Sequence, residues 1–256
     1  MIPVLGVPIL NRGDLLLDLV ASIDFPVEKL AIVQNGQEQD VVDAVEKIKS
    51  GTNPNVKSVY VSVPFRNLGC GPAWNHIIKS FPEASLWMIA NSDMIFAAGD
   101  LEKSYNAHVE NPNAFLMSIG FALFGITPHV VKECGLFDEN IYPAYFEDNE
   151  YQARLYNSNI ERIDVPSRVV REEGSFTIRS NSFYNSANGQ SYPMNEIYFF
   201  KKWGVNAVQP DGSVGFKTPY NDPNKSLGTW EYDPMRRRIQ SKFWDNMDTF
   251  SNRTVF

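Results

Sequence analysis

Cysteine and histidine are scarce in this chain, with two cysteines and three histidines among 256 residues. Cys70 and Cys134 are too few for a disulfide framework in a protein of this size, so we expect reduced thiols. Without a cysteine cluster, the three histidines argue against a structural zinc site. We expect His76, His108 and His129 to be helix residues with no catalytic role.

Long apolar runs are also missing. The first ten residues are apolar, but they carry no basic leader, and Asn11 and Arg12 end the run. No apolar run approaches the roughly 20 residues that a membrane-spanning helix needs. We therefore expect no secretory signal, no integral membrane segment and a cytoplasmic location.

Positive charge is in deficit, with 23 basic against 30 acidic residues and a formal net charge of −7. Such a chain has no overall attraction for nucleic acid or for an anionic membrane surface. A ligand that carries phosphate must therefore be held at a local site, and a metal ion would help to hold it. The 43% of hydrophobic residues is enough for a large core, in one domain or in a domain with an appendage.

The first part of the chain alternates between short apolar runs and segments with helical periodicity. The runs at 4–9, 30–33 and 86–90 predict strands, of which the first is expected to be buried, and the alternating segment 56–63 predicts another. Helices are expected after Asn11, which we take as an N-cap, at 41–48, and from the segment Gly69–Gly71 onward. This β-α-β-α-β-α-β order predicts a mainly parallel sheet with helices on both faces.

The second part is less regular. We expect helices at 101–109 and 147–156, strand-like residues at 115–126 interrupted by Gly120, and an extended segment at 160–170. From about residue 181 the composition shifts to Asn, Ser, Gly, Pro and Tyr, which favours long loops facing a ligand. A last helix is expected at 234–247, where Met235, Ile239, Phe243 and Met247 recur at spacings of four.

The residues at the end of each predicted strand of the first part are mostly polar. They are Pro8 and Asn11, then Gln34, Asn35 and Gly36, then Arg66 and Asn67, then Asn91, Ser92 and Asp93. Because ligands bind at the carboxyl ends of parallel strands, this series predicts a site for a base, a ribose and phosphates. The chain has no Walker A motif and no GxGxxG turn at residues 69–72, so P-loop and dinucleotide sites are disfavoured.

Three acidic residues are candidates for chemistry. Asp93 lies between two apolar runs, where a divalent cation bridging it to a diphosphate would account for it; a turn or helix-cap role is the alternative. Glu147 and Asp148 stand at a predicted helix N-terminus, where the helix dipole alone favours carboxylates. Nearby aromatic residues favour a site that positions and deprotonates a sugar hydroxyl.

The motifs occur in a characteristic order. They are Pro8-Ile9-Leu10-Asn11-Arg12, Val33-Gln34-Asn35-Gly36, an Asn-x-Gly-x-Gly-x-x-x-Asn segment from Asn67 to Asn75, Asn91-Ser92-Asp93, Gly135-Leu136-Phe137-Asp138-Glu139, Tyr145-Phe146-Glu147-Asp148 and Lys202-Trp203-Gly204. In this order and spacing, over about residues 3–204, the chain resembles an inverting family-2-type glycosyltransferase of the GT-A fold. The rhamnosyltransferase-like branch is the most similar.

The resemblance implies a GT-A-like, Rossmann-like α/β domain at 1–204 and a helical or loop extension at 205–256 packed on it. Residues 1–98 would bind a UDP-, GDP- or dTDP-sugar, and 99–204 a glycan or glycoconjugate acceptor. Asp93 would carry Mn²⁺ or Mg²⁺, Asp148 would be the general base, and Glu147 would position the acceptor. The implied donor-site residues are Pro8, Asn11, Gln34, Asn35, Arg66, Asn67, Asn75, Asn91 and Ser92. The implied reaction is transfer of one sugar, a hexose by preference, with inversion.

Two departures keep alternatives open. Gln34 stands where the family usually has an acid, and the family's histidine after the Glu-Asp helix is missing, with Glu172 or Glu173 as possible substitutes. A non-catalytic nucleotide-sugar or glycan-binding relative is therefore the first alternative. A nucleotidyltransferase is the second, although its Gly-rich basic loop would be reduced here to Arg12 and Gly13.

Overall fold

The computed structural model describes residues 1–51, 53–158, 160–167 and 176–203. Glu172, Glu173 and all of 204–256 lie outside these ranges. The expectations for the extension and for its helix at 234–247 therefore concern residues outside the described part.

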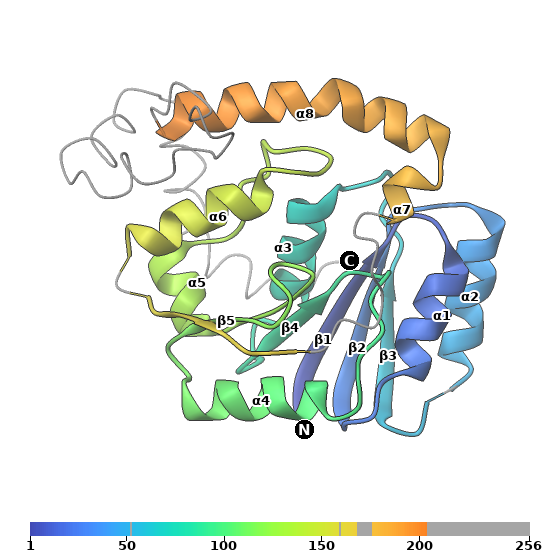
Figure 1. Cartoon of the computed structure of the whole chain (residues 1–256). Helices are drawn as coiled ribbons and strands as arrows, with labels where there is room; N and C mark the ends of the chain where they lie inside the picture. The colour runs from blue at the N-terminus through green and yellow to red at the C-terminus, as the bar shows by residue number, and fades with distance from the viewer. Residues whose placement is uncertain (52, 159, 168–175, 204–256) are drawn as a thin grey trace.

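In the described residues, seven strands form one sheet in the order β3-β2-β1-β4-β6-β5-β7 (Figure 1). The strands are β1 (Ile2–Ile9), β2 (Val27–Gln34), β3 (Val56–Ser62), β4 (Trp87–Ala90), β5 (Phe115–Met117), β6 (Leu123–Ile126) and β7 (Arg162–Asp164). Strands β1 to β4 are parallel to one another, while β6 runs antiparallel to both β4 and β5. The predicted mixed, mainly parallel sheet is confirmed, and a turn around Gly120 separates β5 from β6 as expected.

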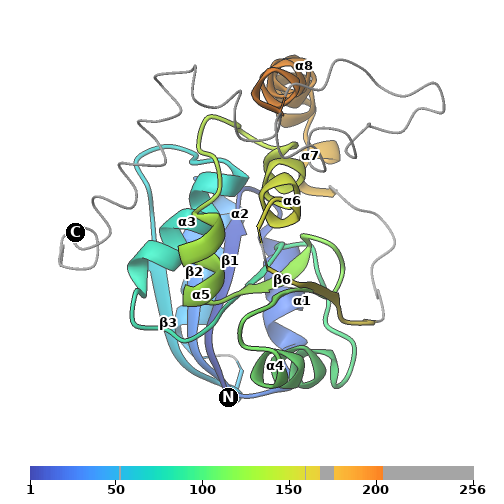
Figure 2. The same cartoon turned by 90° about the vertical axis from the view of Figure 1, so that its left-hand side faces the viewer.

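Helices cover both faces of the sheet, with α1 and α4 on one side and α3 and α5 on the other (Figure 2). The helices are α1 (Gly13–Ala21), α2 (Gln39–Lys49), α3 (Cys70–Ser80), α4 (Asp100–Glu110), α5 (Pro128–Cys134) and α6 (Glu147–Tyr156). Successive strand residues point to opposite faces, so Leu30 and Ile32 join one apolar cluster while Ala31 and Val33 join the other. His76, His108 and His129 lie on α3, α4 and α5, as predicted.

The start of α1 differs from the prediction. Asn11 is not its N-cap. Arg12 occupies that position with φ 62°, and its side chain makes no capping hydrogen bond. The backbone N–H of Gly13 donates instead to Oδ2 of Asp40 on α2, at 3.0 Å. A long-range carboxylate therefore satisfies the helix end, which leaves the Asn11 side chain for another contact.

The largest correction concerns the region from residue 181. We expected loops there, but α7 (Phe176–Arg179) is followed by α8 (Ser182–Trp203), a helix of 22 residues that lies across the top of Figure 1. Pro193 is inside this helix. Asn, Gly and Pro have low helix propensity, but propensity is a weak prior that tertiary contacts override. Here α8 buries one face, on which Asn195, Phe199 and Lys202 recur at helical spacing.

Candidate functional site

The strand order reverses at β1, because β2 and β3 lie on one side of it and β4 on the other. Such a reversal is where open α/β sheets bind ligands, beyond the carboxyl ends of the strands. Asn11 follows β1, and Asn91, Ser92 and Asp93 follow β4, so these residues flank the reversal point. The sheet thus brings to one edge the polar residues that the sequence indicated.

Asn35 connects the end of β2 to the loop before α3. Its Oδ1 accepts from the N–H of Leu68 at 3.1 Å, and its Nδ2 donates to the carbonyl of Gly69 at 3.4 Å. In the same loop, Oδ1 of Asn67 accepts from the N–H of Gly69 at 2.8 Å. Gly36 has no room for a side chain, because a Cβ there would lie 1.6 Å from the carbonyl oxygen of Leu10. Asn35 and Asn67 therefore shape one compact wall.

The other candidates on this side differ in exposure. Asn11 is buried and donates through Nδ2 to the carbonyl of Thr177 on α7 at 2.7 Å, while its buried Oδ1 has no hydrogen-bond partner among the described residues. Gln34 is buried and donates to the carbonyl of Gly36 at 3.2 Å. Arg66 is exposed, and Pro8 is half-buried within β1. An exposed arginine and a buried amide oxygen without a partner are both suited to meet a polar ligand.

Asn75 has a different place from the other candidates. It is fully buried on α3, where its Nδ2 donates to the carbonyl of Phe137 and to Oε1 of Glu139, both at 2.9 Å. Its Oδ1 accepts from the N–H of Phe137, also at 2.9 Å. Through these hydrogen bonds, Asn75 links α3 to the segment after α5, and both ends of its amide are engaged within the protein.

The turn after β4 sets the position of Asp93. The N–H of Asn91 donates to the carbonyl of Ala122 at 2.8 Å, and the carbonyl of Asn91 accepts from Met94 at 3.1 Å. Ser92 is buried and Asp93 is half-buried. A short, doubly anchored turn of this kind presents the carboxylate at the edge of the sheet.

Three acidic residues act electrostatically on the thiol of Cys70, at the start of α3. Burial raises the pKa of this thiol well above its ordinary value, and nearby carboxyl groups raise it further. Those groups belong to Glu147, Asp148 and Asp93. The structure therefore brings together the two acidic motifs, which are more than fifty positions apart in the sequence. The role of Cys70 as their common neighbour was not visible in the sequence.

The residues present fit a metal ion that binds together with a ligand. Within the described ranges, no three His, Cys, Asp or Glu side chains are arranged to hold a metal by themselves. Mg²⁺ and similar hard cations are commonly bound by one or two carboxylates plus the phosphates of a substrate. A half-buried Asp93 at the sheet edge meets that description.

Glu147 and Asp148 occupy the first turn of α6, as predicted, but their environments differ. Burial raises the pKa of Glu147 to about 8, with a further contribution from Asp148. Oε2 of Glu147 is buried without a hydrogen-bond partner in the described residues. Burial also raises the pKa of Asp148, which is more exposed and accepts a bond from the N–H of Asn149 at 2.8 Å. At neutral pH Glu147 is mostly protonated, so Asp148 is the better proton acceptor.

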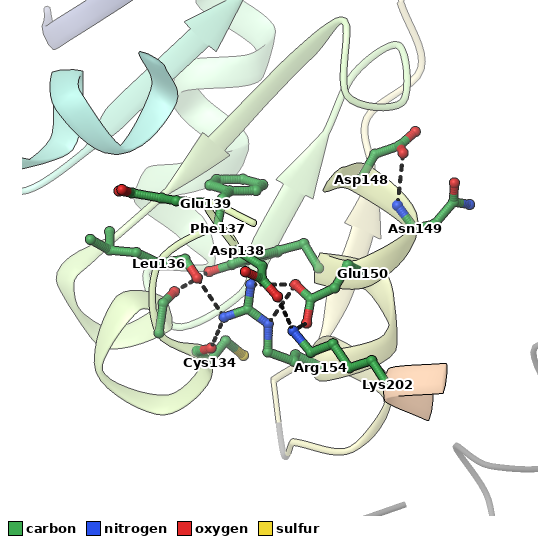
Figure 3. A network of polar contacts seen from close by, with 12 residues as sticks. Cys134, Leu136, Phe137, Asp138, Glu139, Asp148, Asn149, Glu150, Arg154 and Lys202 are labelled. Atoms are coloured by element: carbon green, nitrogen blue, oxygen red, sulfur yellow. Dashed lines mark hydrogen bonds and ion pairs between the residues drawn. The ribbon is translucent and has the colours of Figure 1, made fainter. Parts of the chain in front are cut away.

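A buried ionic network joins α6 to α8 (Figure 3). Lys202 of α8 forms ion pairs with both Asp138 and Glu150, and Arg154 donates to Oε2 of Glu150 from Nε and Nη2 at 3.0 and 2.6 Å. Burial alone would raise the pKa of Asp138, but the Lys202 ammonium outweighs burial and holds that pKa well below its usual range. The network fixes α6 against α8.

No protein-family model and no curated protein matches this chain. Solved structures do match. The mannosyltransferase PcManGT from Pyrobaculum calidifontis, in complex with GDP-Man and Mn²⁺, has a TM-score of 0.55 and 12% identity over 94% of this chain and 74% of its own. S. aureus TarS has a TM-score of 0.53 and 15% identity over 98% of this chain but 55% of its own.

A shorter form of TarS, residues 1–349 in complex with UDP, has a TM-score of 0.53 and 15% identity, with 98% of this chain and 90% of that chain covered. At these identities the likeness establishes the fold. The chain therefore has the α/β fold of a mannosyltransferase structure, in agreement with the predicted fold class. Among the described residues, no helix combines the length and the apolar character that crossing a membrane requires.

Proposed function

We propose that this chain is a glycosyltransferase that moves a sugar from a nucleotide-diphosphate sugar to a glycan acceptor. The observation that carries the proposal is that Asp93, Glu147 and Asp148 all act electrostatically on Cys70, near the edge where the strand order reverses. The fold shared with PcManGT supports it, because that protein was solved with GDP-Man and Mn²⁺. TarS complexes with UDP and with UDP-GlcNAc give the same support for a nucleotide-sugar donor.

The donor would bind across the ends of β1, β2 and β4. The wall formed by Asn35 and Asn67 would face the base and ribose, with Arg66 exposed beside it. Asn11 and Gln34 line the same edge from β1 and β2. Asp93 would hold Mn²⁺ or Mg²⁺, which when bound neutralises the leaving diphosphate.

Asp148 would take the proton from the acceptor hydroxyl. A carboxylate is a stronger base when its pKa is raised, and burial raises the pKa of Asp148. Glu147, protonated at neutral pH, would donate a hydrogen bond to position the acceptor. Attack on the face opposite to the diphosphate would then give inversion in a single displacement, as the resemblance to family-2-type enzymes implies.

A thermal-shift screen tests donor binding. The purified protein is heated with Mn²⁺ and UDP-, GDP- or dTDP-sugars, with EDTA in place of Mn²⁺ as the control. A donor at 100 times its dissociation constant stabilises the folded state by about 2.7 kcal/mol, which raises Tm by several degrees. The proposal predicts such a shift for one nucleotide series only, and its loss in EDTA. No shift with any of the three series would contradict it.

A further inference from the structure

One face of α8 is packed against the segment that leads into α6, the helix that begins with Glu147 and Asp148. On this face Tyr192 contacts the rings of Tyr145 and Phe146, with centroids 5.7 and 5.1 Å away. Phe199, which is fully buried, contacts Phe146 at 5.5 Å. The helix that the sequence failed to predict is therefore a direct neighbour of the residues before Glu147.

Asn195 makes the polar contacts of this face. It is buried, and its Nδ2 donates to the carbonyls of Ala144 and Tyr145 at 3.0 and 3.2 Å. Its Oδ1 accepts from the N–H of Tyr142 at 3.4 Å. One side chain thus binds three backbone groups of a single short loop, residues 142–146.

That loop has a costly conformation. Tyr145 and Phe146 have φ values of 70° and 76°, in the left-handed region that bulky residues rarely adopt. Such residues persist only where surrounding contacts determine them. Phe146 is the N-cap of α6, and its carbonyl accepts from the N–H of Glu150, so the loop determines where α6 begins.

The same loop also contacts the start of α3. The carbonyl of Pro143 accepts from the N–H of Cys70 at 2.8 Å, and in the next residue a Cβ on Gly71 would lie 3.5 Å from the Cβ of Glu147. A Cβ on Gly69 would lie 2.6 Å from that carbonyl, which shows how closely the two segments approach. The loop therefore contacts Asn195 on one side and the start of α3 on the other.

We propose that Asn195 is a positioning residue for Glu147 and Asp148. By binding loop 142–146, Asn195 holds the two left-handed residues that set the start of α6. It thereby fixes the position of both carboxyl groups relative to the strand ends where the donor is proposed to bind. The role in transfer rests on the proposed function, whereas the role in holding the loop does not.

The test compares Asn195→Asp and Asn195→Ala with Asn185→Ala, an exposed position on the same helix. Asn195→Asp has nearly the same shape but sets a carboxylate against two carbonyl oxygens, so its effect should exceed that of Asn195→Ala. Displacing reacting groups by about 1 Å can cost on the order of 10²-fold in rate. We therefore expect kcat for transfer to fall 10- to 100-fold, with unchanged affinity for UDP or GDP plus Mn²⁺ by calorimetry. Asn185→Ala should match the parent protein.

Hydrogen exchange supplies a measurement that does not depend on activity. The amide of Cys70, bonded to Pro143, should exchange at least tenfold faster in both Asn195 variants and at the parent rate in Asn185→Ala. Unchanged protection of that amide, or an equal loss of kcat and nucleotide affinity, would overturn the proposal. If the parent protein turns over no nucleotide sugar, the proposed function fails, while the exchange data still decide whether Asn195 holds the loop. Should Asn195→Asp not fold, Asn195→Ala provides the same comparison.

Discussion

Replacing Glu147 by Gln should stabilise the protein relative to the parent, and this gain should be larger at alkaline pH than at acidic pH. The folded state raises the pKa of Glu147 from 4.5 to about 8, chiefly through burial. The folded protein thus binds this proton more tightly than the unfolded chain, and stability falls as pH rises from 4.5 toward 8. Since one pKa unit corresponds to about 1.4 kcal/mol, the penalty grows by about 4 kcal/mol between pH 5 and pH 8.5.

Glutamine has the same shape and no charge, so Glu147→Gln removes this penalty. The assay is urea unfolding of the parent, Glu147→Gln and Glu133→Gln at pH 5 and pH 8.5, with Glu133 as an exposed carboxylate on α5. Relative to the parent, Glu147→Gln should gain about 4 kcal/mol more at pH 8.5 than at pH 5, and Glu133→Gln should show no such change. If the gain of Glu147→Gln is equal at both pH values, Glu147 is not buried as a protonated acid.

Three further variants test other parts of the structure. Asp93→Asn should abolish the Mn²⁺-dependent part of UDP or GDP binding measured by calorimetry, whereas Asp164→Asn, an exposed position on β7, should not. His108 is buried without a hydrogen-bond partner in the described residues, and burial lowers its pKa to about 4. The folded state disfavours its protonation, so stability should fall by about 3 kcal/mol as pH drops from 6.5 to 4, and His108→Leu should remove that loss in urea unfolding. Lys202→Met leaves two buried carboxylates without their shared cation and should cost about 3–5 kcal/mol in the same assay.

Each of these has a clear contrary result. Mn²⁺-dependent nucleotide binding that survives in Asp93→Asn would place the metal elsewhere. If the parent protein and His108→Leu lose the same unfolding free energy between pH 6.5 and pH 4, the histidine has a polar partner. A loss below about 1 kcal/mol in Lys202→Met would mean that the ion pairs are exposed to solvent.

The fold could be predicted from the sequence where burial in the core requires a recognisable pattern of apolar residues. Strands β1, β2 and β4 are mostly buried on both faces, so they are continuous apolar runs that stand out from the amphipathic helices between them. Strand β3 lies at the edge of the sheet, where no residue is fully buried, and its sequence alternates instead. Asp93 became a candidate because an acid between two apolar runs is seldom an ordinary surface residue, and Glu147 and Asp148 became candidates because aromatic residues stand beside them. Their proposed roles stay predictions. The mainly parallel sheet then brings the ends of these runs to one edge.

What the sequence did not predict depends on contacts between distant residues. Helix α8 lacks a strong helical pattern, and its stability comes from Asn195 and Lys202, whose partners are about 50 and 60 residues away. The side chain of Asn11 is bonded to Thr177, 166 positions along the chain, so no local rule could separate this contact from an N-cap. The environment that distinguishes Glu147 from Asp148 is likewise a product of packing around Cys70.

The most direct test of the central claim is sugar transfer by the parent protein and by Asp148→Asn. Release of nucleoside diphosphate is followed with UDP-, GDP- and dTDP-sugars, Mn²⁺ and a panel of glycan acceptors, with Asp164→Asn as the matched control. The account predicts that the parent transfers sugar from one donor series. In Asp148→Asn, transfer should fall by about 10²–10⁴ while donor affinity is unchanged, since only the proton acceptor is lost. A parent protein that binds a donor but never releases the diphosphate, or an Asp148→Asn variant that transfers at the parent rate, would contradict it.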